Sequence, residues 1–200
     1  MIALTLALAL GILTGLLQVQ PADDSTSILE RLAVAAVECT RHTSEVRYDG
    51  SYRRIPYPGG DVPADVGVCT DLVVRAYRAV GTDLQRLVHE DMRADFDAYP
   101  KLWGLSRPDP NIDHRRVPNL QRFFERKGAE LPVSANGADY RPGDVVTWML
   151  PGNLPHIGVV TSLESSSGRF LVAHNIGRGP ELEDMLFDFE VTGHYRYAGE

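Results

Sequence analysis

The chain changes character at Tyr140, and this change limits the possible folds more than any other feature of the sequence. Before Tyr140, apolar residues recur at the spacing of amphipathic helices. After it come short runs rich in Val, Ile, Phe and Tyr, separated by turn signals, which is the pattern of strands. This order predicts an α+β fold with N-terminal helices packed on one face of a small antiparallel β-sheet. The predicted helices span residues 25–42, 70–80, 84–99 and 118–127, and the predicted strands span residues 144–150, 156–162, 169–174 and 191–197.

The first residues of the chain differ from the rest. Residues 2–17 carry no charge and are almost wholly apolar. They are too few to span a membrane, which takes about 20 residues, and they resemble the apolar region of a secretory signal. We therefore expect residues 1–22 to be a signal peptide or an uncleaved N-terminal anchor, and residues 23–200 to form a single domain. This predicts an exported protein, periplasmic or extracellular, that meets a membrane only through an uncleaved segment.

The charge of the chain bears on its partners. The formal net charge is −7 and no basic tract is present, so the sequence gives no support to nucleic-acid binding. The pairs Arg53-Arg54 and Arg115-Arg116 are expected to be solvated surface residues. A monomer is expected.

The two cysteines, Cys39 and Cys69, have different surroundings. One disulfide between them is possible in an exported protein, and the alternative is one structural and one reactive thiol. Cys39 lies among apolar residues at helical spacing, whereas Cys69 lies where a loop meets a helix. The free N–H groups and the dipole of a helix N-terminus favour a thiolate, and the same N–H groups can stabilise an oxyanion. Cys69 is therefore a candidate nucleophile, with a buried cysteine packed on the sheet as the alternative.

A nucleophilic cysteine needs a base, and two of the six histidines are well placed. His156 opens one predicted strand and His174 ends the next. If these strands form a hairpin, the start of one lies beside the end of the other, which brings the two histidines together. A base oriented by a second polar group is the general arrangement of nucleophilic hydrolases. We therefore predict His156 as the base for Cys69, oriented by His174.

Three segments carry a resemblance to a known family. The first is Tyr57-Pro58-Gly59-Gly60, which precedes Cys69; the second is residues 141–146 together with residues 156–160; the third is Val172-Ala173-His174. They resemble the NlpC-type cell-wall peptidases, a papain-like superfamily that cleaves peptide bonds in peptidoglycan stems. More narrowly, the stretches YPGGDVP, HEDM, NIDHRRVPNL and HNIG resemble an uncharacterised bacterial family within that superfamily.

The resemblance implies a papain-like, NlpC-type fold and a role for each matching residue. Cys69 would attack a carbonyl and form a thioester, and His156 would take the thiol proton and return it to the leaving amine. His174, or the neighbouring Asn175, would orient His156. Tyr57 would point its hydroxyl toward the oxyanion or the substrate carbonyl. The substrate implied is a peptidoglycan peptide, with no cofactor and no metal.

Some features depart from this family pattern. The superfamily usually has Asp-Cys-Ser at the nucleophile, whereas this chain has Val68-Cys69-Thr70-Asp71. Asp71 would lie in the first turn of the Cys69 helix, where it either lines the site or simply caps the helix. The insert at residues 84–118 is atypical. It ends in a polar cluster that binds the stem peptide or, as we favour, holds the insert together by side-chain-to-backbone bonds: Asp109, Asn111, Asp113 and His114.

Other classes of hydrolase have less support. A zinc hydrolase using His156 and His174 would be expected to show an H-x-x-x-H or C-x-x-C spacing, and neither is present. A serine hydrolase would be expected to show G-x-S-x-G, which is also missing. Two alternatives stay open: a catalytically silent exported binding module, and a thiol amidase or acyltransferase that acts on something other than peptidoglycan.

Overall fold

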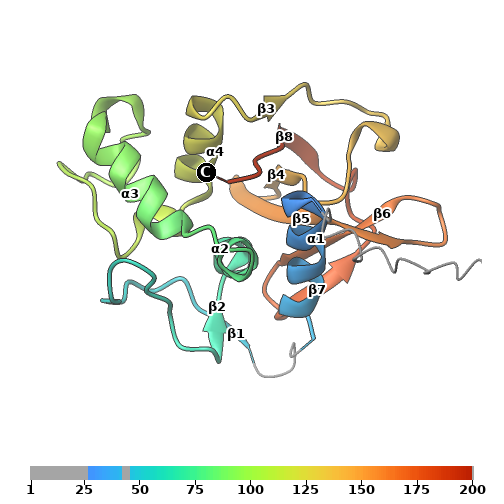
Figure 1. The fold of residues 1–200 in the computed structure, drawn as a ribbon, viewed down its shortest axis with the longest axis horizontal. Helices are drawn as coiled ribbons and strands as arrows, with labels where there is room; N and C mark the ends of the chain where they lie inside the picture. The colour runs from blue at the N-terminus through green and yellow to red at the C-terminus, as the bar shows by residue number, and fades with distance from the viewer. Residues whose placement is uncertain (1–26, 42–45, 200) are drawn as a thin grey trace, which may run out of the picture.

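In the computed structural model, which describes residues 27–41 and 46–199, helices lie against a six-stranded antiparallel sheet (Figure 1). The α+β prediction is confirmed. The α-helices are α1 (Ile28–Cys39), α2 (Cys69–Ala79), α3 (Leu84–Ala94) and α4 (Val117–Arg126), and the short 3-10 helices are η2 (Phe96–Ala98), η3 (Asp113–Arg115) and η4 (Gly137–Asp139). The strands are β1 (Arg47–Tyr48), β2 (Val66–Gly67), β3 (Glu130–Leu131), β4 (Val145–Leu150), β5 (Leu154–Glu164), β6 (Phe170–Asn175), β7 (Pro180–Glu183) and β8 (Glu190–Tyr195).

The large sheet has the strand order β3-β8-β4-β5-β6-β7, and every neighbouring pair in it is antiparallel. Strands β5 and β6 form the predicted hairpin, with Gly158 opposite His174. Strands β1 and β2 form a separate parallel pair, which leads directly into α2. The sequence missed β7, because its first residue, Pro180, belongs to a Gly-Pro turn signal and its four residues show no clear alternation.

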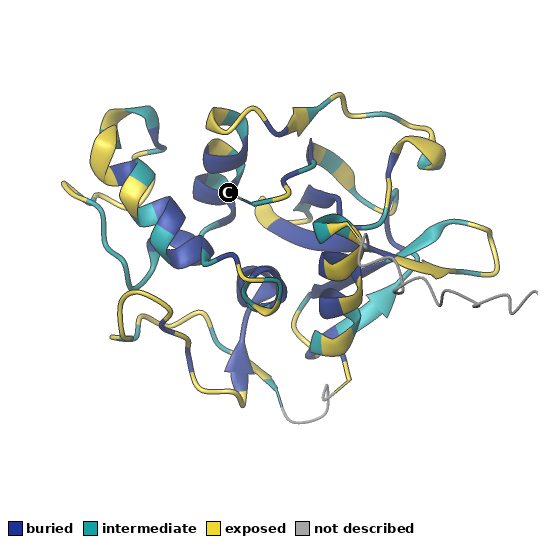
Figure 2. Ribbon diagram, in the orientation of Figure 1, coloured by how far each residue is buried: buried dark blue, intermediate teal, exposed yellow. Residues whose placement is uncertain are grey.

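The sheet is buried on both faces, and Figure 2 shows buried residues along its central strands and on the inner sides of the helices. On one face Ile157, Val159 and Ala173 pack with α1, α2 and the other helices. On the opposite face Val160 and Val172 pack with Trp148 and with side chains of the segment before β8. Because side chains alternate along a strand, neighbouring residues of β5 serve different cores.

The helices of the described ranges are all too short or too polar to cross a membrane. The expected signal peptide or anchor at residues 1–22 lies outside these ranges, as do the first and last residues of the helix predicted at 25–42. Helix α1 begins after Ser27, whose side chain accepts a hydrogen bond from the Glu30 backbone while the Glu30 carboxylate accepts one from the Ser27 backbone. This reciprocal capping explains why the helix starts there.

A buried carboxylate, Asp144, fixes the entry into β4. It accepts hydrogen bonds from His194 Nε2 at 2.7 Å and from two nitrogens of Arg196 at 2.7 and 2.8 Å, and its other partner is the backbone N–H of Arg141 at 2.8 Å. Burial by itself would raise the pKa of Asp144, but these hydrogen bonds outweigh it and hold the pKa below its usual range. Gly143 beside it has φ +88°, and a Cβ there would lie 2.3 Å from the carbonyl oxygen of Leu29. The Gly-Asp pair of the family-like motif is therefore structural.

We predict that Asp144→Asn lowers the free energy of unfolding by about 3–5 kcal/mol at pH 7, because it removes one partner from a buried charge network. A carboxylate whose pKa is lowered by folding contributes stability above its unfolded pKa of about 4, and this contribution is lost as the pH falls further. The difference in the free energy of unfolding between the wild type and Asp144→Asn should therefore be smaller at pH 3 than at pH 7. Urea denaturation at both pH values measures this difference, with the exposed Asp188→Asn as control. A difference that does not change with pH would contradict the prediction.

Candidate active site

Cys69 is the first residue of α2, and the sequence around it explains the start of this helix. The carboxylate of Asp71 accepts a hydrogen bond from the backbone N–H of Val68 at 2.8 Å, which caps the first turn. Cys69 and Cys39 are both free thiols, so the disulfide alternative is not realised. The Cys69 side chain is almost wholly buried, 4% exposed, on the helix side of the sheet.

The Cys69 sulfur lies among hydrogen-bond donors. Burial raises the pKa of this thiol to about 11, although backbone N–H groups of Ile157 and Thr70 and the Tyr48 hydroxyl donate toward the sulfur and act in the opposite direction. The helix N-terminus thus favours the anion as expected, but burial outweighs it. Chemistry at Cys69 therefore requires a base that removes the thiol proton.

The tyrosine beside the thiol is Tyr48, whereas Tyr57 packs against α3. Tyr48 ends β1, next to β2 and α2, and its hydroxyl lies near enough to the Cys69 sulfur to lower the pKa of the thiol. The ring of Tyr57 packs edge-on against His89 of α3, with 4.9 Å between the ring centres. Sequence reasoning missed Tyr48 because the loop between the two tyrosines has no periodicity from which its path could be read. The parallel pairing of Tyr48 with Gly67 was the missing information.

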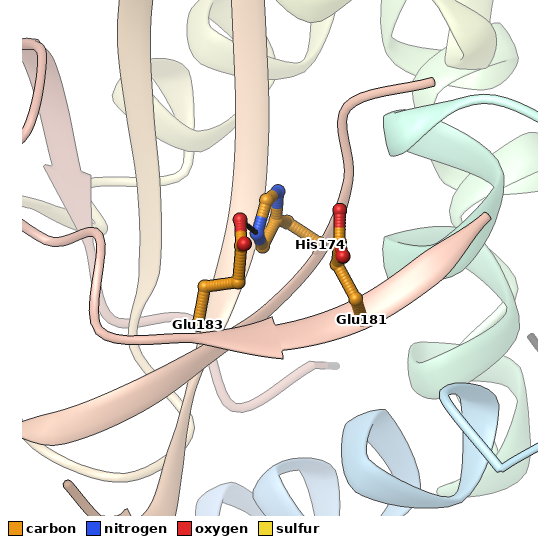
Figure 3. A group of neighbouring side chains, drawn as sticks. All are labelled: His174, Glu181 and Glu183. Atoms are coloured by element: carbon orange, nitrogen blue, oxygen red, sulfur yellow. Dashed lines mark hydrogen bonds and ion pairs between the residues drawn. The ribbon is translucent and has the colours of Figure 1, made fainter. Parts of the chain in front are cut away.

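His156 and His174 meet as the hairpin argument predicted. The Nε2 atom of His156 lies 3.0 Å from Nδ1 of His174. On its other side, Nε2 of His174 lies 3.0 Å from a carboxylate oxygen of Glu183 on β7 (Figure 3). Gly158 makes room for this arrangement, because a Cβ there would lie 2.7 Å from Val172 and 3.1 Å from the Cβ of His174. Sequence reasoning missed Glu183, since it missed the strand that carries it.

Both histidines are neutral at physiological pH. Burial lowers the pKa of His156 to about 3, and the neighbouring His174 adds to this effect. Burial also lowers the pKa of His174 to about 4, which the charge of Glu181 opposes and that of Arg178 reinforces. A neutral imidazole has one nitrogen free to accept a proton, as a general base requires.

The thiol and the His156 ring reach the start of β5 from different sides. His156 alternates with Ile157, and its ring lies near Trp148, with 5.9 Å between the ring centres. The thiol comes from the helix side to the N–H of Ile157, the residue that follows His156. Strand β6 pairs with β5 only from Gly158 onward, so the edge of β5 before Gly158 has no β6 partner.

Asn175 does not bind His156. It is buried, and its side chain lies 3.5 Å from the carbonyl of Gly67 and accepts from the N–H of Gly177 at 3.1 Å. Of the two residues considered for orienting His156, His174 is the one in hydrogen-bond contact with it. Asn175 instead lines a mostly apolar cavity of about 470 Å³, which Gly67, Val68 and Cys39 also line.

Asp71 is part of a buried ion pair. Its two oxygens accept from Arg115 Nε and Nη2 at 2.8 and 2.9 Å, and both side chains are almost wholly buried. Arg115 also donates to the carbonyl groups of Asp49 and Ser51, at 3.1 Å each. The expectation that Arg115 is a solvated surface residue is therefore wrong, because its buried partner Asp71 is far away in the sequence. Asp71 holds the helix start and the loop after Tyr48, which is the capping role rather than a place in the substrate site.

The polar cluster of the insert is built from hydrogen bonds within the protein. The carboxylate of Asp113 accepts from the backbone of Asp109, and the Asp109 carboxylate accepts from the backbone and side chain of Asn111. Asn111 in turn accepts from the backbone of Ile55 at 3.0 Å. Asp113 and its neighbour His114 are buried. These contacts favour the structural role for the cluster.

One group of side chains near the site could hold a metal ion. His174, Glu181 and Glu183 each offer a ligand atom, and these atoms lie within 4.8 Å of one another (Figure 3). The two nitrogens of His174 are already in hydrogen bonds with His156 and Glu183. An ion bound at His174 Nε2 would therefore replace the contact with Glu183.

We predict that Tyr48→Phe slows alkylation of Cys69 by iodoacetamide about fivefold between pH 7 and 9. The variant loses a donor to the thiolate, worth about 1 kcal/mol, so the pKa of the thiol rises and less thiolate is present at a given pH. Mass spectrometry of the labelled peptides measures the rate, with Cys39 in the same molecule as internal reference. Tyr57→Phe is the matched control. If Tyr57→Phe slows labelling while Tyr48→Phe does not, the assignment of Tyr48 is wrong.

Comparison with known proteins gives a family and several distant structures. A family model described as a domain of unknown function, DUF1287, matches residues 34–197. A protein of Escherichia coli (strain K12) named uncharacterized protein YijF is 51% identical over 166 residues, which are 83% of this chain and 81% of that protein.

Three solved structures are similar at low identity. An N-acetylmuramoyl-L-alanine amidase from Bacteroides uniformis ATCC 8492 is similar over 84% of this chain and 97% of its own, with 12% identity and a TM-score of 0.48. NlpC1 from Trichomonas vaginalis covers 88% of this chain, with 16% identity and a TM-score of 0.45, and NlpC2 covers 87%, with 15% identity and a TM-score of 0.43. The matches take up 46% and 48% of those two chains, so this chain spans about half their length.

Proposed function

Because this chain belongs to the DUF1287 family, whose name assigns it no reaction, we propose its function from the candidate site: a cysteine hydrolase that cleaves an amide bond. One observation carries the proposal. The hairpin of β5 and β6 joins His156 to His174 through Nε2, at 3.0 Å, which leaves Nδ1 of His156 for another partner. The residue after His156 donates its backbone N–H to the Cys69 sulfur, so thiol and base share one strand end.

In the proposed reaction the Cys69 sulfur attacks the carbonyl carbon of the amide while its proton passes to Nδ1 of His156. The new negative charge on oxygen is met by hydrogen-bond donors at the helix start. The tetrahedral intermediate breaks its C–N bond, and the leaving amine takes the proton from His156. A thioester remains on Cys69. Water, deprotonated by His156, attacks the thioester, and the acid leaves as the Cys69 thiol re-forms.

The two neutral groups fit this sequence of steps. The pKa of the Cys69 thiol is raised to about 11 and that of the His156 imidazole is lowered to about 3. The thiol therefore keeps its proton until substrate is bound. Proton transfer therefore accompanies attack, with His156 as general base. Tyr48 and the N–H groups of Thr70 and Ile157 are in place to stabilise the sulfur anion that forms.

The proposed substrate is the stem peptide of peptidoglycan, and the proposed place of action is outside the cytoplasm. The first rests on the resemblance of the segments around Cys69, His156 and His174 to the NlpC-type peptidases, and the second on the apolar residues 2–17. The papain-like arrangement is proposed on the same resemblance, with a cysteine at a helix start and a histidine at a strand start. The cavity lined by Val68 and Asn175, about 470 Å³ in volume, is large enough for a side chain or two of such a peptide.

We predict that Cys69→Ala and His156→Ala each lower hydrolysis of purified peptidoglycan at least a thousandfold, because each removes a reacting group. Mass spectrometry of the released fragments tests activity and identifies the bond that is cut. Asp188→Asn, at an exposed position outside the site and the cavity, is the control and should retain full activity. Fragments released equally by Cys69→Ala would overturn the assignment of the nucleophile. Acyl transfer to an added amine, in place of hydrolysis, would identify an acyltransferase.

We predict that a chelator such as EDTA leaves this hydrolysis unchanged. The proposed chemistry uses only the thiol, the imidazole and water, and both nitrogens of His174 already have hydrogen-bond partners. The measurement is the initial rate before and after dialysis against the chelator. Loss of activity that Zn²⁺ restores would instead indicate an ion held by His174, Glu181 and Glu183.

A further inference from the structure

Glu183 has no place in the proposed reaction, yet it lies at the far end of the histidine pair. We propose that Glu183 is a positioning residue: its carboxylate fixes the tautomers of both His174 and His156, so that His156 presents an unprotonated Nδ1. The consequence for catalysis rests on the proposed function. The tautomers themselves do not, because they follow from the hydrogen bonds of the protein without substrate.

The tautomers follow from what each group can donate. An ionised carboxylate only accepts hydrogen bonds, so the 3.0 Å contact between Glu183 and His174 requires the proton to be on Nε2 of His174. A neutral imidazole carries one N–H, so Nδ1 of His174 is an acceptor. The 3.0 Å contact between this atom and Nε2 of His156 then requires the proton of His156 to be on Nε2. The lone pair of His156 is therefore on Nδ1, the nitrogen proposed to take the thiol proton.

The surroundings hold Glu183 in its accepting role. Its second carboxylate oxygen lies 3.2 Å from Nη2 of Arg178, so each oxygen has a different donor. The side chain is 37% exposed, which keeps one side of the carboxylate in contact with solvent. His174 itself is fully buried, so its Nε2 has no direct access to solvent as a substitute partner. The carboxylate thus supplies a contact that the buried ring needs.

The register of β6 and β7 distinguishes Glu183 from the neighbouring acid Glu181. Glu181 lies directly opposite His174 in the sheet, and Glu183 lies opposite Val172. Both acids point to the same face and both have Arg178 within 3.4 Å, but Glu183 is the one hydrogen-bonded to the His174 ring (Figure 3). Glu181 acts on His174 only through its charge. Glu181 is therefore a control for Glu183, because replacing it removes a carboxylate near His174 without removing a hydrogen bond to the ring.

Without Glu183 the opposite arrangement becomes available. His174 could carry its proton on Nδ1 and donate it to Nε2 of His156. The single proton of His156 would then be on Nδ1, and no lone pair would face the thiol. A population of this form would lower the fraction of molecules with a competent base. The effect should appear in kcat and leave KM unchanged, because no contact to substrate is lost.

The direct test is the ¹⁵N NMR spectrum of the full chain with labelled histidines at pH 7, where the shifts of the two ring nitrogens identify each tautomer. We expect His156 and His174 to carry their protons on Nε2 in the wild type and in Glu181→Met. In Glu183→Met, which has similar length and no acceptor, we expect the Nδ1–H form to appear at both rings. A wild type with Nδ1–H, a Glu183→Met spectrum without change, or the same change in Glu181→Met would overturn the proposal.

The test of the consequence is hydrolysis of peptidoglycan fragments by the same variants. We expect Glu183→Met to lower kcat at least about tenfold with KM unchanged, Glu183→Gln to recover part of the loss through its carbonyl oxygen, and Glu181→Met to stay within about twofold of wild type. The midpoint of thermal unfolding of each variant shows that the fold persists. An unchanged kcat in Glu183→Met, with Cys69 still required, would overturn the positioning role alone. If no variant hydrolyses any fragment while the tautomers behave as expected, the proposed function fails and the role of Glu183 in fixing the rings stands.

Discussion

The ion pair between Asp71 and Arg115 is the interaction on which the geometry around Cys69 depends. Both groups are buried, and a buried charge is tolerated only when its partners are close and numerous. Asp71 is satisfied by the two guanidinium nitrogens and by the N–H of Val68, and Arg115 by Asp71 and two backbone carbonyls. The pair thereby joins the start of α2, the insert that carries Arg115, and the loop that follows Tyr48. The thiol and the tyrosine that donates to it are held by the same contact.

Asp144 anchors the sheet through buried hydrogen bonds, as Asp71 anchors the start of α2. It is a buried carboxylate with donors from three separate points of the chain: the turn before β4, the end of β8 and the residue beyond it. This contact fixes β4 against β8, and β4 is the strand on which β5 is registered, with Trp148 opposite His156. The two halves of the site, thiol and imidazole, are therefore each anchored by a buried acid outside the reacting groups. Such anchors give one defined arrangement, since each acid is satisfied only when all of its donors are in place.

The sequence predicted a contact of the site only where a local pattern of residues determines that contact. The contact between His156 and His174 was predictable, because two alternating runs joined by a short turn form a hairpin, and a hairpin places the start of one strand beside the end of the next. Tyr48 was not predictable, since its position depends on a parallel pairing of two residues with a distant segment. Arg115 looks in the sequence like any surface arginine, and only its distant partner buries it. Glu183 lies on a strand of four residues whose start resembles a turn.

In the proposed reaction, one physical cause, burial, keeps both reacting groups neutral before substrate binds. Burial raises the pKa of the Cys69 thiol and lowers that of His156, so both groups are neutral until a proton passes between them. The charges that this transfer creates are met at opposite ends of the site. The thiolate is surrounded by the Tyr48 hydroxyl and two backbone N–H groups, whereas the positive imidazole is linked through His174 to the carboxylate of Glu183. In the proposed reaction, donors lie where negative charge would form and an acceptor lies where positive charge would form, so the arrangement would favour the charge-separated state once substrate is present. A structural cysteine in an apolar cluster would need neither the donors around its sulfur nor an acceptor linked to a nearby histidine.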